Sequence, residues 1–436
     1  MEQAPLFWAL SRVLACCLFL AAGILPAQEV AERELTLEAA RAEALAANAD
    51  LRAASARVEE ARGRLIEART YPHNPDLELE LGDRDGTEGS SSDRGVGLTQ
   101  ELELAGQRGK RTAAAREELA AVEADLARLR REVLAATEIA FVQALAARDL
   151  LAVAESDVEL TAGLASFEER RLEAGAGTQL DLNLARAASG RAQNRRYAAE
   201  VAWLEERARL AKLVGADPVA PPLPIGDLPL DAVLLRPLEE LAAQALGRRA
   251  DLEALRREVA RAERIVELER ALAVPNLRFG AFSRREEGDD VVGGSLSMAI
   301  PLFDRNQGRR AEARAALSSR SAELLGGERG ALREVAGAYA RASAASRALA
   351  ALEGLVVGTL EENLRLLQQA FEAGKVNASD VLVLRRELVE GRREQIAVAE
   401  ERAIAVAELE VAIGGVAPAP ALDSLSEPIP PQENEP

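Results

Sequence analysis

The chain has 436 residues, of which 29% are charged and only 3% are aromatic, and its formal net charge is −18. Such an acidic chain lacks the clustered basic surface that nucleic acid binding requires, so we expect no nucleic-acid partner. The predominance of Ala, Leu, Glu and Arg favours long helices over a large compact core.

An apolar run from Val13 to Leu25 at the N-terminus predicts export from the cytoplasm. This run is shorter than the roughly 20 residues that span a bilayer as a helix, so we expect a signal peptide over residues 1–27, cleaved after Ala27. Both cysteines, Cys16 and Cys17, lie inside it, so the mature chain has none for a disulfide. The segment 13–16 loosely resembles a lipoprotein cleavage site, which leaves lipidation open.

The remainder of the chain is duplicated. Glu173-Ala174-Gly175 recurs as Glu372-Ala373-Gly374, 199 residues later, and Ala49-Asp50-Leu51 recurs as Ala250-Asp251-Leu252, 201 residues later. This period is far longer than the units of solenoids and propellers. We therefore predict two half-domains with the same elements in the same order. The expected boundaries are 28–215 for the first repeat, 216–247 for a proline-rich linker, 248–415 for the second repeat, and 416–436 for a disordered acidic tail.

Each repeat contains a long stretch without proline, which permits very long helices. In the first, apolar residues alternate spacings of three and four, as in a coiled coil, at Leu119, Val122, Leu126, Leu129 and Val133. A helix from Gly109 to Gly175 would be about 100 Å long. Glycine followed by aspartate at the next helix start predicts a chain reversal near residues 175 and 374. We thus expect one long helical hairpin per repeat, over 108–215 and 307–415.

Short segments in each repeat alternate apolar and polar residues one for one, which is typical of a strand with two unlike faces. The clearest case is Leu77-Glu78-Leu79-Glu80-Leu81, and a similar pattern covers residues 277–281 and 296–300. We predict one β-hairpin per repeat, over 76–104 and 276–302. The fold class is therefore α+β, mainly α, with four strands per chain.

The apolar face of these strands needs a partner. In lipid every backbone polar group must be paired, and the smallest closed barrels have about eight strands, so four strands insert only if several chains assemble. In that arrangement the leucines contact lipid and the alternate carboxylates face the lumen: Glu78, Glu80, Glu101 and Glu103. The alternative is a small soluble sheet that caps a coiled-coil rod.

Three segments resemble the TolC-like outer-membrane efflux proteins. They are Asn48-Ala49-Asp50-Leu51, the segment QELELAGQRGKR over 100–111, and PLFDRNQG over 301–308, of which the last two resemble the CzcC-type branch of heavy-metal efflux. The resemblance implies an outer-membrane homotrimer, with one twelve-stranded β-barrel continued by a helical tunnel through the periplasm. It also implies two partners, a periplasmic adaptor and an inner-membrane pump of the resistance-nodulation-division class.

The resemblance further implies where the tunnel closes and where the adaptor docks. Asp380 matches the position from which family members project a carboxylate into the closed periplasmic entrance, and Asp181 is its repeat mate. Both aspartates are also suited to cap helices. Some relatives carry a second aspartate three residues later, where this chain has Val383. The expected adaptor-docking tips are Ala174, Gly175, Ala176, Ala373, Gly374 and Lys375.

We expect this chain to provide passage rather than chemistry. It has no nucleophile and base pair or phosphate loop, and its single histidine, His73, lies in a Pro-His-Asn-Pro turn without an evident set of partner ligands. No enzyme activity, cofactor or resident metal is predicted. The acidic residues either line the lumen and favour cations or lie on the solvated exterior.

Two other functional classes remain open, a periplasmic coiled-coil adaptor and an envelope scaffold. The cargo is also open, because a passive duct accepts what its pump delivers. Heavy-metal cations are the first expectation, and drugs or other organic solutes are the alternative.

Overall fold

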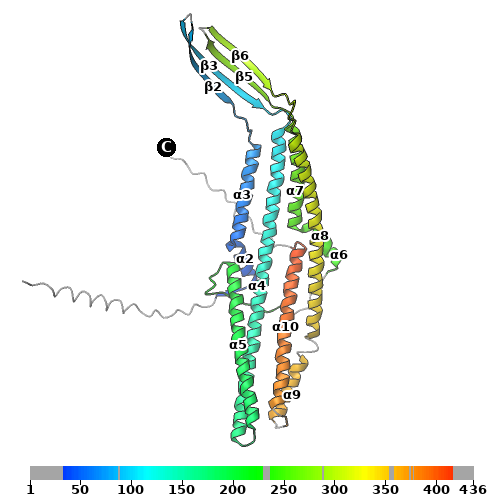
Figure 1. Ribbon diagram of the computed structural model, residues 1–436. Helices are drawn as coiled ribbons and strands as arrows, with labels where there is room; N and C mark the ends of the chain where they lie inside the picture. The colour runs from blue at the N-terminus through cyan, green and yellow to red at the C-terminus, as the bar shows by residue number, and fades with distance from the viewer. Residues whose placement is uncertain are drawn as a thin grey trace, which may run out of the picture.

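The computed structural model describes residues 33–86, 89–228, 236–286, 289–352, 358–372, 375–376 and 378–415. The predicted signal peptide and acidic tail, and the docking residues Ala373 and Gly374, lie outside these ranges. The described part is elongated, with a β-sheet at one end and the tips of helical hairpins at the other (Figure 1).

The first repeat is built around a helix of 67 residues. Thr36 and Asn48 cap two short helices, because their side-chain oxygens accept hydrogen bonds from backbone N–H groups of the first turn. A long helix then runs to the tip and a second long helix returns. The elements are β1 (Glu34–Leu35), α2 (Leu37–Ala47), α3 (Ala49–Arg69), α4 (Gln107–Glu173) and α5 (Gln179–Val214).

The second repeat has the same order, with one difference. Where the first repeat has the single helix α4, the second has two described helices, and residues 353–357 between them lie outside the described ranges. Its elements begin inside the predicted linker, with β4 (Leu223–Pro224) and α6 (Leu238–Arg248). They continue with α7 (Ala250–Ala271), α8 (Gln307–Leu352), α9 (Gly358–Glu372) and α10 (Ala378–Ala412).

Both repeats end in the same way. Gly215 after α5 and Gly414 after α10 have φ angles of 72° and 68°, the left-handed conformation that glycine adopts without steric cost. Both also lie against the start of their own repeat. A Cβ at Gly215 would lie 2.4 Å from the Cβ of Ala47, and one at Gly414 would lie 2.8 Å from the backbone of Arg248. Each helical hairpin is thus closed onto the short helices of its repeat.

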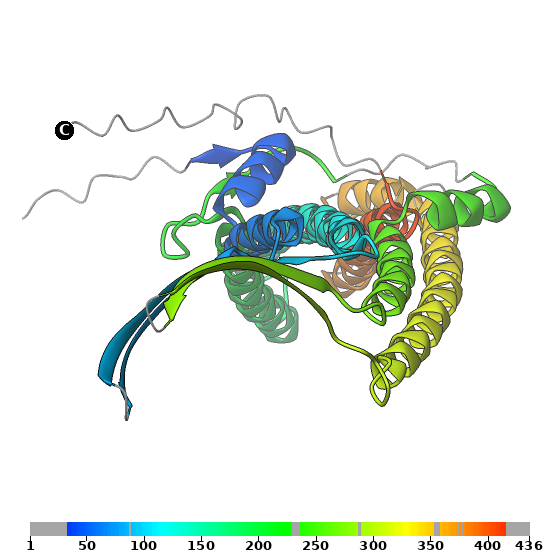
Figure 2. The same cartoon turned by 90° about the horizontal axis from the view of Figure 1, so that it is seen from above.

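The four long strands form one antiparallel sheet in the order β2-β3-β5-β6. They are β2 (Asp76–Gly86), β3 (Gly89–Leu102), β5 (Leu277–Glu286) and β6 (Asp289–Met298). Their lengths of 10 to 14 residues reach the roughly 9 to 11 that a tilted transmembrane strand needs. The pairing of β3 with β5 joins the two repeats, and the sheet curves strongly when seen from above (Figure 2).

Small side chains let the helices pack closely in three clusters. One joins α2, α4 and α5 around Phe141 and Leu210, and a second joins α6, α8 and α10 around Val335 and Leu409. The third lies near the tips and joins the two hairpins through Leu164, Leu364 and Val381 among others. The predicted fold class, mainly helical with a duplicated half-domain and two β-hairpins, is confirmed. Among the described residues, no helix is long and apolar enough to cross a bilayer.

Candidate functional site

One face of the sheet is apolar and exposed. The register pairs Leu77 with Leu98, Leu79 with Val96 and Phe279 with Leu296, so these side chains gather on the same face. Each of them is between 45% and 73% exposed in the single chain. A contiguous apolar surface of this kind marks contact with lipid or with another protein.

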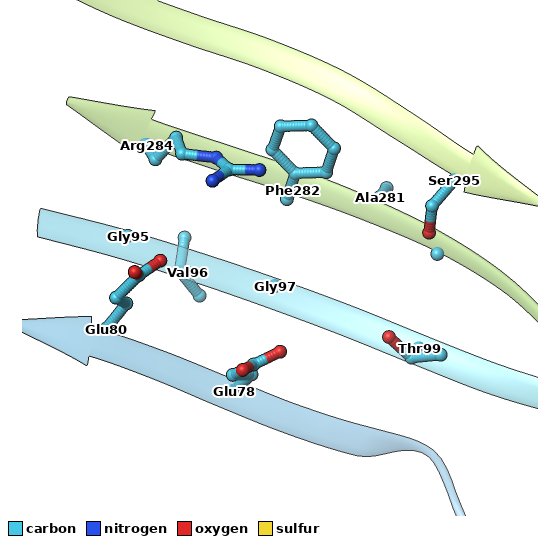
Figure 3. Close-up of a pocket in the computed structure, with 11 residues that line it drawn as sticks. Glu78, Glu80, Gly95, Val96, Gly97, Thr99, Ala281, Phe282, Arg284 and Ser295 are labelled. Atoms are coloured by element: carbon cyan, nitrogen blue, oxygen red, sulfur yellow. The ribbon is translucent and has the colours of Figure 1, made fainter. Parts of the chain in front are cut away.

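The opposite face is polar and hollowed. Glu78 and Glu80 of β2 lie beside Gly97 and Gly95 of β3, at the edge of a hollow of about 200 Å³ (Figure 3). A Cβ at Gly95 would lie 3.3 Å from Oε2 of Glu80 and 3.3 Å from Cβ of Arg284. Glycine on β3 therefore makes room for side chains of opposite charge from the strands on either side.

Two of the four predicted lumen carboxylates lie at the base of the sheet and have different surroundings. Glu101 is on β3, on the same face as Glu78 and Glu80, since its neighbours alternate with the apolar residues. Glu103 lies beyond the end of β3 and its side chain is only 6% exposed. Its carboxylate accepts hydrogen bonds from the backbone N–H of Arg108 at 2.9 Å and from Arg111 at 2.5 Å. Glu103 therefore stabilises the first turn of α4 and lies off the strand face on which it was predicted.

His73 has partners that the sequence did not indicate. Its Nε2 lies 3.6 Å from Oε1 of Glu101 and 3.3 Å from Nδ2 of Asn276. Asn276 lies 203 residues along the chain, so no local pattern around His73 could predict this contact. His73 therefore has two polar neighbours, one of them a carboxylate. Among the described residues, no three side chains of the His, Cys, Asp and Glu types converge as metal ligands.

At the other end of the molecule, α4 ends in a glycine-containing cap. Gly175 has a φ of 75°, its N–H donates to the carbonyl of Leu172, and the N–H of Ala176 donates to the carbonyl of Arg171 at 2.8 Å. Ala174, Gly175 and Ala176 are all exposed.

The second tip repeats this hydrogen bond. The N–H of Lys375 donates to the carbonyl of Ala370 at 2.9 Å, and both residues lie 199 positions after their counterparts in the first tip. Lys375 is exposed.

Sequence reasoning passed over Gly177. A Cβ there would lie 3.0 Å from the backbone nitrogen of Leu172, so the first tip folds back tightly on α4. Its repeat mate, Val376, instead packs into the cluster that joins the two hairpins. The two tips therefore differ in shape, and the alternation of Ala and Gly over 174–177 was the available signal.

The two candidate gate residues begin the returning helices. The backbone N–H of Asp181 donates to Oγ1 of Thr178 at 3.1 Å, and the Thr178 hydroxyl donates to the Asp181 carboxylate at 2.7 Å. Asp181 is thus part of a helix cap. Asp380 is exposed in the first turn of α10, and Val383 one turn later is exposed as well.

A buried charge cluster ties the two hairpins together. Asp157 of α4 is 3% exposed, and its carboxylate accepts hydrogen bonds from Arg195 of α5 at 2.6 Å and from Arg385 of α10 at 2.5 Å. Arg385 is also buried. These residues are far apart in sequence and of common types, so no local sequence pattern groups them.

The profile of the family described as "Outer membrane efflux protein" matches residues 40–216 and 241–415. The chain belongs to this family. It is 27% identical over 361 residues to the cobalt-zinc-cadmium resistance protein CzcC of Cupriavidus metallidurans, covering 82% of this chain and 85% of CzcC. The predicted resemblance to TolC-like proteins and to the CzcC-type branch is confirmed.

Solved outer-membrane channels have a similar fold. The CusC structure matches with a TM-score of 0.73 at 19% identity, over 87% of this chain and 92% of CusC. VceC of Vibrio cholerae matches with a TM-score of 0.71 at 21% identity, over 87% of this chain and 96% of VceC. Membership of the outer membrane efflux protein family places the chain in the outer membrane, and the adaptor and scaffold alternatives are set aside.

Two carboxyl groups on α10 of this outer-membrane efflux protein have pKa values above the ordinary value of a glutamate. Burial raises the pKa of Glu400, and the nearby charge of Glu206 raises it further. Burial and Glu138 likewise raise the pKa of Glu410, against a smaller opposing effect of Arg41.

Proposed function

We propose that this protein is a passive duct made of three copies of the chain. Its cargo is delivered by an inner-membrane pump of the resistance-nodulation-division class through a periplasmic adaptor. The observation that carries the proposal concerns the sheet and the row of long helices. Each of them ends in an open edge from the first repeat on one side and an open edge from the second repeat on the other.

In the sheet, β2 of the first repeat forms one edge and β6 of the second forms the other. The long helices follow the same order, since α5 packs on α4, α4 on α10, and α10 on α8 and α9 (Figures 1 and 2). Joining the first-repeat edge of one copy to the second-repeat edge of the next therefore closes both layers at once. Three copies supply twelve strands, which exceeds the minimum of about eight for a closed barrel.

The outer edge of α5 supports this assembly. Apolar side chains on it are exposed in the single chain, with spacings close to a coiled-coil repeat. We call these residues the α5 stripe: Leu180, Leu184, Tyr197, Val201 and Leu204. A helix with a second apolar stripe needs a second partner, and the neighbouring copy supplies it.

We infer that the cargo is a heavy-metal cation. CzcC is named for resistance to cobalt, zinc and cadmium. Glu78, Glu80 and Glu101 share one face of the sheet, which in the closed barrel is the lumen, where carboxylates raise the local concentration of cations. Asp380 and Asp181 would narrow the periplasmic entrance, and the two tips would receive the adaptor. The repeat boundaries and cleavage after Ala27 belong to the same proposal.

Complementation of a strain that lacks the gene tests this function. The natural chain should restore growth on cobalt, zinc and cadmium salts and lower the metal content of the cells. Gly175→Trp, which places a bulky side chain at the tip, should fail to do so while its trimers remain in the outer membrane. Gly63→Trp is the matched control, since Gly63 also has open space around it but lies on α3, far from the tips.

Two results would contradict the proposal. If the natural chain restored growth on organic toxicants but not on metal salts, the cargo would be an organic solute rather than a metal cation. Full metal resistance with Gly175→Trp would show that the first tip is not part of the surface that receives the adaptor.

A further inference from the structure

We propose that His73 and Glu101 form a binding site for a divalent transition-metal ion at the base of the sheet, where the barrel meets the tunnel. The site would hold an ion such as Zn²⁺ with two protein ligands and water, and Asn276 would occupy its place when no ion is bound. Metal binding by these residues stands on their geometry alone. Only its position on the path of the cargo rests on the proposed function.

The distance between the two ligand atoms fits one ion. Nitrogen and oxygen ligands of tetrahedral zinc lie about 2.0 to 2.2 Å from the metal, which places two of them about 3.4 Å apart. Nε2 of His73 and Oε1 of Glu101 are 3.6 Å apart. The two atoms therefore need almost no movement to bind the same ion.

A donor group already lies where the ion would bind. Nδ2 of Asn276 is 2.8 Å from Oε1 of Glu101 and 3.3 Å from Nε2 of His73. An amide nitrogen only donates hydrogen bonds, so Oε1 of Glu101 presents a lone pair toward it, and Nε2 of His73 does so in the tautomer that carries its proton on Nδ1. A metal ion requires the same arrangement of lone pairs, with the imidazole neutral and its proton on Nδ1.

Surrounding contacts fix these groups in place. The Oδ1 of Asn276 accepts a hydrogen bond from Gln107 at 3.2 Å, and Gln107 is fully buried at the start of α4. The ring of Tyr71 meets the His73 ring edge-on, with centroids 5.8 Å apart. Groups that orient ligands in this way reduce the reorganisation needed on binding.

The charges around the site favour weak, reversible binding. Oε2 of Glu101 accepts a hydrogen bond from Arg278 at 3.0 Å, and this positive charge opposes a second cation nearby. The side chains of His73 and Glu101 are 29% and 24% exposed, so an ion and its waters can reach them. A site of this kind suits an ion in transit better than one that stays bound.

The site exists in one repeat only. With Pro75 aligned to Pro275, the positions of His73 and Glu101 correspond to Ala273 and Pro301. His73 is also the only histidine of the chain, so each copy would carry a single site of this composition.

Titration of the purified, untagged trimer with Zn²⁺ tests the inference, by calorimetry and by protection of the imidazole from diethyl pyrocarbonate. We expect one ion per chain and slower modification of His73 as Zn²⁺ is added. His73→Ala should weaken binding at least tenfold, and Glu101→Gln should weaken both binding and protection. Glu239→Gln is the matched control, because it removes an exposed carboxylate of α6, away from the sheet, and should bind as the natural chain does.

Natural affinity in His73→Ala, or no protection of His73 by Zn²⁺, would overturn the site. A trimer band on gels run without heating shows that each variant has assembled, so lost binding cannot be ascribed to misfolding. Failure of the natural chain to confer metal resistance in cells would contradict the duct proposal and leave this titration unaffected.

Discussion

At the scale of single residues, two glycines have the same backbone conformation in different surroundings. Gly175 at the first tip and Gly215 at the end of α5 have φ angles of 75° and 72°. A Cβ at Gly175 would meet nothing within 4 Å, whereas one at Gly215 would lie 2.4 Å from the Cβ of Ala47. Backbone strain is therefore common to both positions, and a steric clash exists at only one.

This difference predicts unequal effects of the same substitution. Gly175→Ala should lower the free energy of unfolding by about 1 to 2 kcal/mol through backbone strain. Gly215→Ala should lose roughly a further 1 to 3 kcal/mol, because the added methyl group forces α2 and α5 apart. Chemical denaturation followed by circular dichroism would measure both. Equal losses would show that the close contact with Ala47 does not restrain this end of the hairpin.

At the scale of elements, the two helical hairpins are held together by apolar contacts and by one buried carboxylate. Asp157 bonds to both Arg195 and Arg385, and the side chain of Arg385 is 6% exposed. Removing one partner from a buried pair leaves an uncompensated charge, which costs more than the pair contributes when intact. The cluster therefore fixes how α10 lies against α4.

Asp157→Ala should reduce the free energy of unfolding by about 3 to 5 kcal/mol. The matched control is Glu169→Ala, which breaks an exposed pair with Arg186 at 2.5 Å and should cost less than about 1 kcal/mol. Replacing Asp157 and Arg385 together with leucine should recover much of the lost stability. A loss no larger than that of Glu169→Ala would show that the buried cluster does not hold the hairpins together.

At the scale of the whole molecule, the single chain is incomplete. The sheet has an apolar face with two open edges, and the α5 stripe is exposed on the described part of the chain. Closure by neighbouring copies removes the open strand edges, which lipid does not tolerate.

A charge within the α5 stripe should therefore weaken assembly. Val201→Asp is expected to shift the protein from trimer to monomer, because the carboxylate would be buried between copies without a partner. Val219→Asp is the control, since Val219 is 91% exposed and lies outside the stripe. Gel electrophoresis without heating and light scattering in detergent would measure the change. An intact trimer with Val201→Asp would place the contact between copies elsewhere.

Much of the architecture could be predicted from the sequence, because it depends on local periodicity. Alternation of leucine and glutamate over 77–81 predicts a strand with two faces, and spacings of three and four over 119–133 predict the long helix α4. The duplication predicts that both repeats have their elements in the same order, and the glycines at 175 and 215 predict where helices end. Each of these signals lies within a few residues of the structure that it predicts.

Only the tertiary structure decided which distant residues meet. Glu103 continues the alternation of β3 in sequence, yet the strand ends at Leu102 and the carboxylate bonds to the start of α4. His73 is an isolated histidine in the sequence, and it gains Glu101 and Asn276 only because β2, β3 and β5 start or end at the same level of the sheet. Side-chain alternation records which face a residue takes but not which neighbour it has, and that choice depends on strand order and on packing between repeats.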